Sequence, residues 1–347
     1  MPSIYQTKSS EETIELGMQL AKHLQPGISV LLFGDLGSGK TQFVKGIAKG
    51  LGITENIKSP TFAYLNKYPV EGGNLYHFDL YRLKHGEGFE SIGLEEAMHD
   101  PHAITIIEWA DRMAGRHPEA YIRIDFRSLA DHHEIAIHFE DPEIVPEALV
   151  EKYYEDWATP MHVRSHCRAV KDLCFQIGQA YIENNVLINL DLLNTAALLH
   201  DVTRICDFTE LDRNKFHEEI TEEKWNKWVD LRNRYQGLHH ADIAYKAFLD
   251  EGYAKTAEVI RLHNSLSILE EPEKLEDFEA GILFYADKRV KHDEVVSLAE
   301  RFEDGRIRHG KYDEPKTRSK FEEVEKRTFK LEEKLFELIN LNPDNLT

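Results

Sequence analysis

The first 140 residues alternate between stretches with helical spacing of apolar residues and short, continuously apolar runs. In "SSEETIELGMQLAKHL", Ser9 stands three residues before Glu12, which is the spacing of a capping box. The apolar residues that follow share one helical face: Ile14, Met18, Ala21 and Leu24. The runs "ISVLLFG" and "AITIIEWA" suit strands buried on both faces, whereas "YIRIDFRS" and "HEIAIHFE" alternate as edge or hairpin strands do. This pattern predicts an α/β domain with a mostly parallel sheet.

The pattern changes in "EDPEIVPEALVEKYYEDWATP", residues 140–160, which holds three prolines and many acids and has no strand-like alternation. Beyond it almost every apolar stretch has helical spacing. We therefore predict an α/β domain over residues 1–142, a linker over 143–160 and an all-α domain over 161–347. The stretch "ITEEKWNKWVDLRNRYQG" is compatible with a lid over a nucleotide and with an ordinary amphipathic helix.

Composition restricts the partners and the compartment. The 347 residues are 41% hydrophobic, enough for two cores. Lysine and arginine total 42 against 62 acidic residues, a net charge of −20, which argues against direct strong binding of nucleic acid. No apolar run approaches the ~20 residues of a membrane span, and no signal peptide is evident. Three cysteines without a C-x-x-C pair suggest a reducing compartment, so we expect a cytoplasmic protein without membrane contact.

The sequence "GDLGSGKT", residues 34–41, fits the pattern G-x-x-x-x-G-K-[ST] between a predicted strand and a predicted helix. Glycines let backbone N–H groups turn toward phosphates, Lys40 reaches the terminal phosphates, and the Thr41 hydroxyl is a ligand for Mg²⁺. ATP and Mg²⁺ are therefore the expected cofactors. The nucleotide contacts are expected from Gly34, Gly37, Ser38, Gly39, Lys40 and Thr41.

A P-loop needs a carboxylate near the metal and a group that positions the attacking water. The candidates are Asp79 in "LYHFDLYRL" and Glu108, which ends a predicted buried strand. A lone acid is often only a surface carboxylate, but the end of a buried strand favours a functional role. The loop "SPTF" offers Thr61 as a switch residue.

Four stretches in this order, "GDLGSGKTQFVKGIAKGLG", "SPTFAYLNKY", "LYHFDLYRL" and "IIEWADR", resemble the TsaE family of ATPases in bacterial tRNA threonylcarbamoyladenosine synthesis, over roughly residues 5–140. The resemblance implies that Thr61 is the switch threonine, Asp79 a magnesium-side acid and Glu108 the catalytic acid. It also implies that Trp109 is an aromatic of the nucleotide site, and it departs from the family at Gln42, often a second threonine. It further implies a partner, a heterodimer like TsaD–TsaB.

The second half carries an ordered set of histidines and aspartates on predicted helices, several at helix ends. Imidazole and carboxylate together are ligands for iron, manganese, zinc or nickel. An aspartate directly after a histidine can bridge two metals, and a metal pair ~3.5 to 4 Å apart supports hydrolysis of phosphate esters and anhydrides. Any one of these histidines, His162, His217 and His292 included, is more often a capping or surface residue.

The ordered set resembles the HD-domain metal-dependent phosphohydrolases, over roughly residues 160–300, and among them the six-ligand, two-metal members, including those that cleave diadenosine tetraphosphate. The resemblance implies these ligands: His166, His200, Asp201, His240, His263 and Asp287. His239 is an alternative ligand to His240. Ala244, a small residue one helical turn after His240, favours His240. Where the family often has Ile-Gly-Lys after the doublet this chain has Val-Thr-Arg, so Arg204 is the expected phosphate contact and catalytic residue.

The combined prediction is a fusion of a TsaE-like ATPase with an HD phosphohydrolase that acts on an adenine nucleotide, an adenylate or a dinucleoside polyphosphate. A second interpretation treats the helical half as a metal-holding or nucleotide-sensing module without turnover that regulates docking of the ATPase. A third, a P-loop small-molecule kinase with an accessory helical domain, lacks an evident acceptor-binding segment in the first half.

Overall fold

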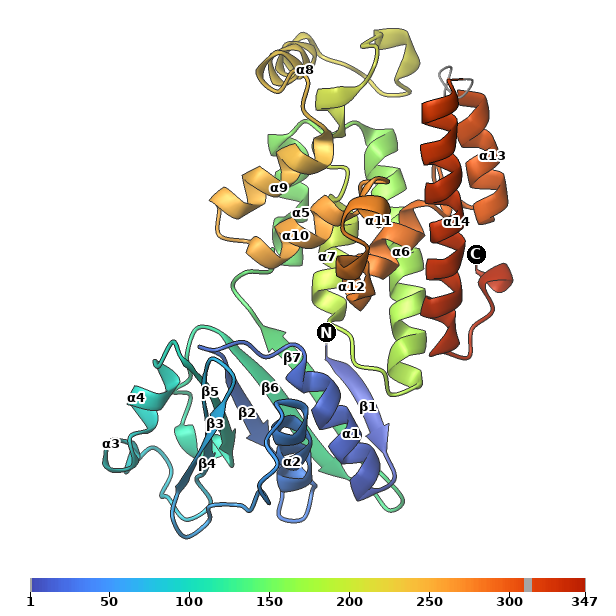
Figure 1. Cartoon of the computed structure of the whole chain (residues 1–347). Helices are drawn as coiled ribbons and strands as arrows, with labels where there is room; N and C mark the ends of the chain where they lie inside the picture. The colour runs from blue at the N-terminus through green and yellow to red at the C-terminus, as the bar shows by residue number, and fades with distance from the viewer. Residues whose placement is uncertain (1, 309–313, 347) are drawn as a thin grey trace. The chain divides into compact units, whose positions relative to one another are not determined.

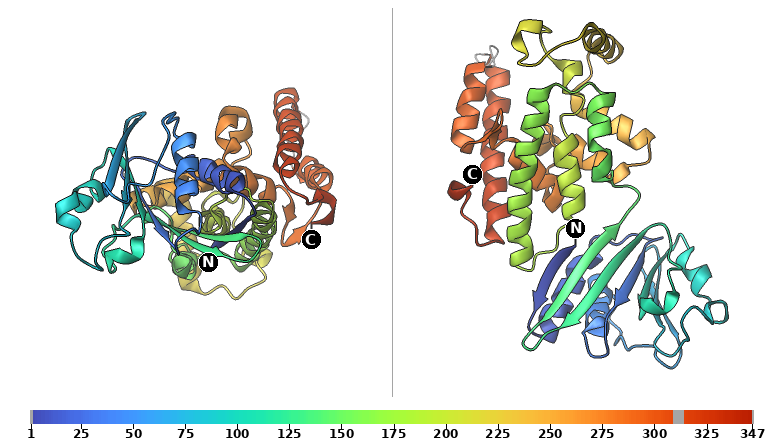
Figure 2. Two further views of the ribbon diagram at one scale, coloured as in Figure 1. Left: turned by 90° about the horizontal axis from the view of Figure 1, so that it is seen from below. Right: turned by 180° about the vertical axis from the view of Figure 1, so that it is seen from behind.

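The computed structural model describes residues 2–308 and 314–346 and divides into two compact units. The first unit comprises the chain up to Pro142 together with Tyr181–Leu187. The second comprises Glu143–Ala180 and the chain from Ile188 onward (Figures 1 and 2). The chain thus divides after Pro142, and Tyr181–Leu187, which lies within the predicted all-α range 161–347, belongs to the first unit.

The first unit is an α/β domain around one seven-stranded sheet. Its strands are β1 (Ser3–Thr7), β2 (Ser29–Phe33), β3 (Leu65–Val70), β4 (Gly73–Asp79), β5 (Ala103–Glu108), β6 (Tyr121–Ser128) and β7 (His133–Glu140). Its helices are α1 (Ser10–Ala21), α2 (Lys40–Gly50), α3 (Phe89–Ile92) and α4 (Leu94–Met98), with a 3-10 turn η1 (Ala110–Met113).

The strand order is β1-β7-β6-β2-β5-β4-β3. Strand β2 is parallel to β5 and β6, and β4 is parallel to β5. Because β1 and β6 are both antiparallel to β7, five of the seven strands, β1, β6, β2, β5 and β4, run in the same direction. The sheet is therefore mostly parallel. Strands β6 and β7 form the predicted hairpin, but neither lies at an edge.

Helices α1 and α2 lie side by side on one face of the sheet (Figure 1). They approach closely because glycines face each other: a Cβ on Gly46 would lie 2.1 Å from the Ile14 carbonyl oxygen, and one on Gly17 would lie 2.3 Å from that of Phe43. The buried face of α1 agrees with the predicted one at Ala21, and Leu24 beyond the helix is buried as well, but it differs at Ile14 and Met18. The buried residues are Thr13, Leu16, Gly17, Leu20 and Ala21, whereas Ile14 and Met18 are only partly buried.

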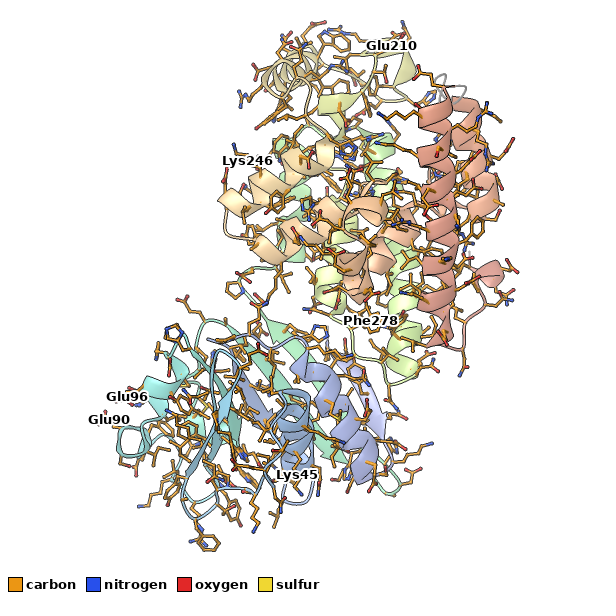
Figure 3. The ribbon with its side chains drawn as sticks, viewed as in Figure 1. Lys45, Glu90, Glu96, Glu210, Lys246 and Phe278 are labelled. Atoms are coloured by element: carbon orange, nitrogen blue, oxygen red, sulfur yellow. The ribbon has the colours of Figure 1, made fainter. Side chains whose placement is uncertain are left out.

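The second unit is built mainly of helices. They are α5 (Val150–Asp156), α6 (Met161–Glu183), α7 (Leu190–Leu199), α8 (Glu222–Arg234), α9 (His240–Asp250), α10 (Ala254–Leu262), α11 (Ser267–Glu270), α12 (Phe278–Asp287), α13 (Leu298–Arg308) and α14 (Pro315–Glu337). The 3-10 turns are η2 (Glu147–Leu149), η3 (Arg204–Asp207), η4 (Arg213–Lys215), η5 (Pro272–Glu276) and η6 (Pro343–Asn345). Charged side chains such as Glu90 and Glu96 in the first unit and Lys246 in the second point outward (Figure 3).

Two features of this unit differ from the sequence predictions. Residues 143–160, expected to be a linker, contain η2 and α5, and α5 packs against α7 because Tyr154 is buried and donates a hydrogen bond to the Leu198 carbonyl oxygen at 2.5 Å. The unit is also not purely α, since Val290–Lys291 (β8) and Glu294–Val295 (β9) form a two-stranded antiparallel ribbon. Two-residue pairing is too short to produce a recognisable alternation of apolar residues.

Helix α8, considered as a lid, is instead attached to the helical core. Trp228 is fully buried, and its Nε1 donates to the Ala158 carbonyl oxygen at 2.7 Å. It packs with Ile205, Phe216 and Ile243. These contacts favour the amphipathic-helix interpretation. Over residues 2–308 and 314–346, no helix is long and apolar enough to cross a membrane.

Candidate functional site

The glycine-rich loop joins the end of β2 to the start of α2. Gly34 has a φ of +138°, and a Cβ there would lie 2.6 Å from the Phe126 carbonyl oxygen. Gly39, the residue before α2, has a φ of +100°. Both positions therefore require glycine, and they place backbone N–H groups at the N-terminus of a helix, which is favourable for a phosphate.

Lys40 is buried at the centre of this loop. Its ammonium group donates to the carbonyl oxygens of Gly34 and Asp35, both at 2.7 Å, and lies 4.1 Å from the centre of the Trp109 ring. Burial lowers the pKa of Lys40, and Glu108 and Asp79 partly offset this effect. The first turn of α2 thus holds one buried cation that a phosphate chain can contact.

The two candidate acids end neighbouring strands. Asp79 and Glu108 are paired in register across β4 and β5, because parallel strands bring their carboxyl ends to the same edge of the sheet. Thr41 donates its hydroxyl to the Glu108 carboxylate at 2.9 and 3.0 Å. His77 is fully buried, and its Nε2 lies 2.9 Å from Glu108 Oε1. Glu108 is therefore fixed between the P-loop threonine and a buried imidazole.

Asp79 binds the loop that carries Thr61. Its Oδ2 accepts hydrogen bonds from Ser59 and, at 2.6 Å, from Thr61. Its Oδ1 accepts from the Tyr81 backbone N–H at 2.9 Å. The candidate switch loop and the second strand end are thus connected through one carboxylate.

A cavity of about 330 Å³ brings these groups together. The predicted residues that line it are Gly37, Ser38, Gly39, Lys40, Thr41, Thr61, Asp79, Glu108 and Trp109, and Gln42 lines it as well. Sequence reasoning missed Ser59, Tyr81 and His77. Ser59 and Tyr81 lie within two residues of predicted site residues, and His77 follows the strand period of β4 toward the same edge.

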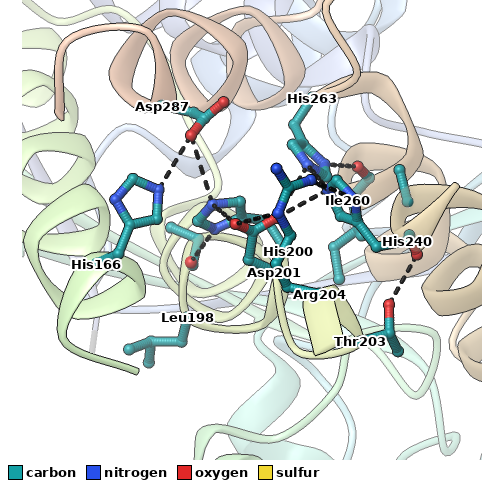
Figure 4. A network of polar contacts seen from close by, with 12 residues as sticks. His166, Leu198, His200, Asp201, Thr203, Arg204, His240, Ile260, His263 and Asp287 are labelled. Atoms are coloured by element: carbon teal, nitrogen blue, oxygen red, sulfur yellow. Dashed lines mark hydrogen bonds and ion pairs between the residues drawn. The ribbon is translucent and has the colours of Figure 1, made fainter. Parts of the chain in front are cut away.

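The histidine and aspartate residues of the second unit meet at the ends of several helices (Figure 4). His200 follows the last residue of α7, His263 follows that of α10, and Asp287 is the last residue of α12. His240 is the first residue of α9, and His166 lies in the first half of α6. All six predicted ligands are therefore brought to one place.

Two carboxylates connect the imidazoles. His166 Nε2 lies 3.1 Å and His200 Nε2 3.7 Å from Asp287 Oδ1. His240 Nε2 lies 2.9 Å and His263 Nε2 3.5 Å from Asp201 Oδ1. His200 Nε2 also lies 4.0 Å from Asp201 Oδ2. Asp201 thus stands between two histidine groups, His166 with His200 and His240 with His263, as a bridging ligand would.

Three of the histidines are oriented by backbone carbonyl groups. The Nδ1 atoms of His166, His200 and His263 contact the carbonyl oxygens of His292, Ala197 and Ile260 at 2.8, 2.7 and 2.5 Å. This bond fixes the tautomer and leaves Nε2 as the ligand atom. The Nε2 of His200 is buried and has no hydrogen-bond partner within the described residues. A divalent metal fits this donor set.

Asp207 contacts the Nδ1 side of the His240 ring. Asp207 Oδ2 accepts from the backbone N–H of His240 at 3.0 Å and lies 2.7 Å from its Nδ1. His239 instead caps α9 by accepting from the Ala241 N–H at 3.2 Å, with its other contacts toward Asp207 and His240. The structure therefore brings His240, not His239, to Asp201. Arg204 Nη1 lies 2.6 Å from His240 Nδ1 and 3.8 Å from Asp207.

Electrostatics keep both carboxylates charged. Burial opposes the charge on Asp201, but His240, Arg204 and His200 outweigh it and hold the pKa of the carboxyl well below its usual range. Burial likewise opposes the charge on Asp287, yet Lys288 and the two histidines lower its pKa well below its usual range. Burial lowers the pKa of His263 to about 4, so this imidazole is neutral at pH 7. Burial also opposes protonation of His200 and His240, but their neighbours, Asp201 among them, raise the pKa of both imidazoles above the usual range. Of these three imidazoles, only His263 is therefore already in the neutral state that binds a divalent metal, and metal binding at the other two would release a proton.

Sequence reasoning missed Asp207 and the role of His292. Asp207 falls six residues after the doublet, and no spacing rule marks it. His292 stands in the turn between β8 and β9 with a φ of +60°, and its carbonyl oxygen, not its ring, orients His166. Only the folded chain brings this turn to α6.

Comparison with known proteins gives matches that cover about a third of this chain. The family described as threonylcarbamoyl adenosine biosynthesis protein TsaE matches residues 7–135. The TsaE protein of Treponema pallidum is 42% identical over 125 residues, which are 36% of this chain and 91% of that protein. The TsaE protein of Bacillus subtilis is 36% identical over 127 residues, 37% of this chain and 78% of its own. The crystal structure of Bacillus subtilis YdiB covers 39% of this chain and 82% of that chain, with 32% identity and a TM-score of 0.33.

Proposed function

The chain belongs to the TsaE family, and from this premise we propose that its first unit is an ATPase that supports tRNA threonylcarbamoyladenosine synthesis while its second unit is a metal-dependent phosphohydrolase. The observation that carries the first part is the cavity that joins the P-loop to Asp79 and Glu108. The observation that carries the second is the convergence of four imidazoles on two carboxylates.

In the first unit, each group has a distinct task. The backbone N–H groups at the start of α2 and the Lys40 ammonium bind the phosphates of ATP. Thr41 and Asp79 would hold Mg²⁺, which when bound neutralises charge on the phosphates. Glu108, fixed by Thr41 and His77, accepts a proton from the attacking water or orients it. Trp109 borders the pocket beside Lys40, and Thr61 connects the loop 59–62 to Asp79.

The partner of this ATPase is a heterodimer like TsaD–TsaB. The related proteins are named for tRNA threonylcarbamoyladenosine biosynthesis, and the matched range of this chain, residues 7–135, contains the P-loop and the two strand-end acids. Because the loop with Thr61 contacts Asp79 directly, nucleotide binding at the P-loop would reach this loop and change the surface offered to the partner. The high negative charge leaves tRNA contact to the partner.

In the second unit, two divalent metals would be held by His166, His200, Asp201, His240, His263 and Asp287. Bound metals supply a water of lowered pKa and bind the phosphate oxygens. Asp201 bridges the two histidine groups, and Asp207 keeps the Nε2 of His240 directed at it. The Arg204 guanidinium lies beside these residues and contacts a phosphate oxygen of the substrate. Hydrolysis consumes one water for each phosphorus–oxygen bond broken.

A substrate with an adenylate or polyphosphate group would give the two units a reason to be joined in one chain. The threonylcarbamoyl-adenylate intermediate of this pathway contains a mixed anhydride with AMP, and hydrolysis at its phosphorus is the chemistry of the second site. Joining both domains in one chain raises the effective concentration of a product of one near the other. We propose that the second unit removes an adenylate or a dinucleoside polyphosphate.

A non-catalytic role for the second unit has one observation in its favour. Arg204 lies within 2.6 Å of His240 Nδ1, so a fixed positive charge already stands next to the expected ligands (Figure 4). A site of this kind can hold a metal or a nucleotide and regulate docking of the ATPase without turnover.

Product analysis by chromatography separates these functions. The full chain is incubated with Mn²⁺ or Fe²⁺ and with ATP, diadenosine tetraphosphate, AMP or threonylcarbamoyl-adenylate, next to Asp201→Ala and Lys40→Ala. The matched controls are Asp242→Ala and Lys49→Ala, which remove the same groups from exposed positions. A product that survives Lys40→Ala and disappears in Asp201→Ala supports the phosphohydrolase. If only Lys40→Ala removes activity, the second unit has no turnover and the regulatory role is supported instead.

A further inference from the structure

A pocket of about 320 Å³ begins at the histidine cluster and extends beyond it. One end is formed by His166 and Asp201, both predicted metal ligands. The rest is formed by residues that have no part in holding a metal, among them His162, Phe208 and Arg301. The volume lies within the range of small-ligand sites, about 300 to 1,000 Å³.

Arg301 supplies a positive charge at a distance from the ligands. It comes from α13, and its Nη1 lies 3.7 Å from Asp304 Oδ2, beyond hydrogen-bond distance. Its Nε is buried and has no hydrogen-bond partner within the described residues. A buried guanidinium N–H without an acceptor is costly, and it is satisfied when a ligand supplies an oxygen. Guanidinium groups match phosphate oxygens in geometry and charge.

Phe208 supplies a flat apolar wall. It is half-buried, and its ring lies 5.9 Å from that of His162 with an angle of 25° between the planes. Burial lowers the pKa of His162, so its ring is neutral at pH 7 and behaves as an aromatic surface. Two stacked rings beside a cation favour a ligand that has both a base and phosphates.

We propose that this pocket selects a nucleoside that carries a chain of two or more phosphates. One phosphate lies at Asp201 and the metal ligands, the next phosphate contacts Arg301, and the base lies against Phe208. In the reaction, the oxygen of water bonds to the phosphorus at the metal end, the bond from that phosphorus to the bridging oxygen breaks, and the leaving oxygen takes up the proton. Asp293 also lines the pocket and is exposed, and its negative charge disfavours a further phosphate next to it.

This inference rests on the proposed phosphohydrolase, and three substrates test it separately. ADP has a base and two phosphates, AMP has a base and one phosphate, and inorganic triphosphate has no base. All measurements use the full chain with Mn²⁺ and with Lys40→Ala in the background, so that the P-loop does not contribute. The variants are Arg301→Gln and Phe208→Leu, with Arg234→Gln and Phe329→Leu, on exposed helix surfaces, as matched controls.

Arg301→Gln is expected to lower kcat/KM by about tenfold or more for ADP and triphosphate, the effect of one lost charge-assisted hydrogen bond, and by less than about twofold for AMP. Phe208→Leu is expected to lower kcat/KM by about fivefold for ADP and AMP and to leave triphosphate unchanged. Arg301→Lys keeps the charge and loses the Nε donor, so its kcat/KM for ADP and triphosphate is expected to lie between those of wild type and Arg301→Gln. A uniform loss over all three substrates in Arg301→Gln would mean a structural role and would overturn the proposal.

Calorimetric titration with α,β-methylene-ADP distinguishes the two possible failures. Binding that depends on Arg301, without turnover of any substrate, supports the pocket and contradicts the phosphohydrolase. Turnover that Arg301→Gln and Phe208→Leu leave unchanged supports the phosphohydrolase and overturns the pocket. Cleavage of AMP with the same kcat/KM as ADP would also overturn the proposed pocket.

Discussion

The two candidate sites are built in opposite ways. The phosphate-binding part of the first comes from one contiguous stretch, residues 34–41, and its acids end two neighbouring strands. The second is assembled from residues between 166 and 287, most of them at or next to helix ends. A local backbone conformation therefore determines the first site, whereas the packing of several helices determines the second.

The charges at the two centres are also opposite. Lys40 places a buried cation in the P-loop, where it can meet a phosphate directly. Asp201 and Asp287 place two carboxylates in the histidine cluster, and both are held ionised by their neighbours. The first site also holds Asp79 and Glu108, but its buried ammonium can meet a phosphate directly. At the second site, the two carboxylates have to be offset by the proposed metals together with Arg204 before an anion binds.

The largest effect is expected from Asp201→Ala. This change removes the carboxylate between the two histidine groups, so metal-dependent hydrolysis should fall to the level of a reaction without protein. ATP hydrolysis at the P-loop should remain. Both rates are measured by chromatography on the same preparation, and a parallel loss of ATP hydrolysis would contradict independent sites.

Lys40→Ala is expected to have the reverse effect. It removes the buried ammonium that contacts the phosphates, and ATP binding measured by calorimetry should weaken beyond detection. Metal content of the helical unit, measured by elemental analysis, should be the same as in wild type. Metal loss in this variant would show that the two sites depend on each other.

The supporting residues should have intermediate effects. Asp207→Asn removes the negative charge and one of the two acceptor oxygens next to His240 Nδ1, and His77→Gln removes the imidazole next to Glu108. Loss of such outer contacts typically costs about 10- to 100-fold in metal affinity or activity. We expect Asp207→Asn to weaken Mn²⁺ binding alone and His77→Gln to slow ATP hydrolysis alone, with Asp242→Asn as the matched control. If Asp207→Asn slowed ATP hydrolysis or His77→Gln weakened Mn²⁺ binding, the two sites would not be independent.

Removal of metal should destabilise only the helical unit. A ligand at 100 times its Kd stabilises the folded state by about 2.7 kcal/mol. Calorimetric scans with and without a chelator should therefore show one transition that shifts by a few degrees and a second that does not move. If neither transition responds in wild type, the cluster does not hold a metal. Asp201→Ala is the control that should lose the response.

The smallest effect is expected from Glu271→Gln, because Glu271 contacts Arg261 near the C-terminal end of α10. Hydrogen bonds from Arg261 and then Lys274 lower the pKa of Glu271 to about 2. Because the pKa is below the ordinary value near 4.5, the contribution to stability is present above pH 4.5 and is lost as the pH falls toward 2. This ion pair is partly exposed, so about 0.5 kcal/mol is expected at pH 7. Urea unfolding of wild type and variant should differ less at pH 3.5 than at pH 7.

The P-loop fold was predictable from sequence because its signals are local. The Ser9 capping box, the glycine pattern and the apolar run that ends at Glu108 each depend on neighbouring residues. The hydrogen bonds of the P-loop site were not predictable to the same extent. His77 reaches Glu108 only because β4 and β5 pair in register.

The helical character of the second unit followed from apolar spacing, but its details did not. Helix α5 was hidden in a stretch with three prolines, and the β8–β9 ribbon is too short for a periodic signal. The ligand candidates came from residue order, whereas Asp207 and the His292 carbonyl act through contacts across 33 and 126 residues of sequence. No local pattern encodes contacts at such separations.

Electron paramagnetic resonance of bound Mn²⁺ shows directly whether the histidine cluster holds a pair of metal ions. The nucleotide-free chain, as wild type and as Lys40→Ala, is titrated with Mn²⁺ and the free ion is removed. The proposed metal pair predicts two ions per chain with the multiline signal of an exchange-coupled pair, and no such signal in Asp201→Ala. Absence of bound Mn²⁺, or a single uncoupled ion that Asp201→Ala leaves unchanged, would contradict it.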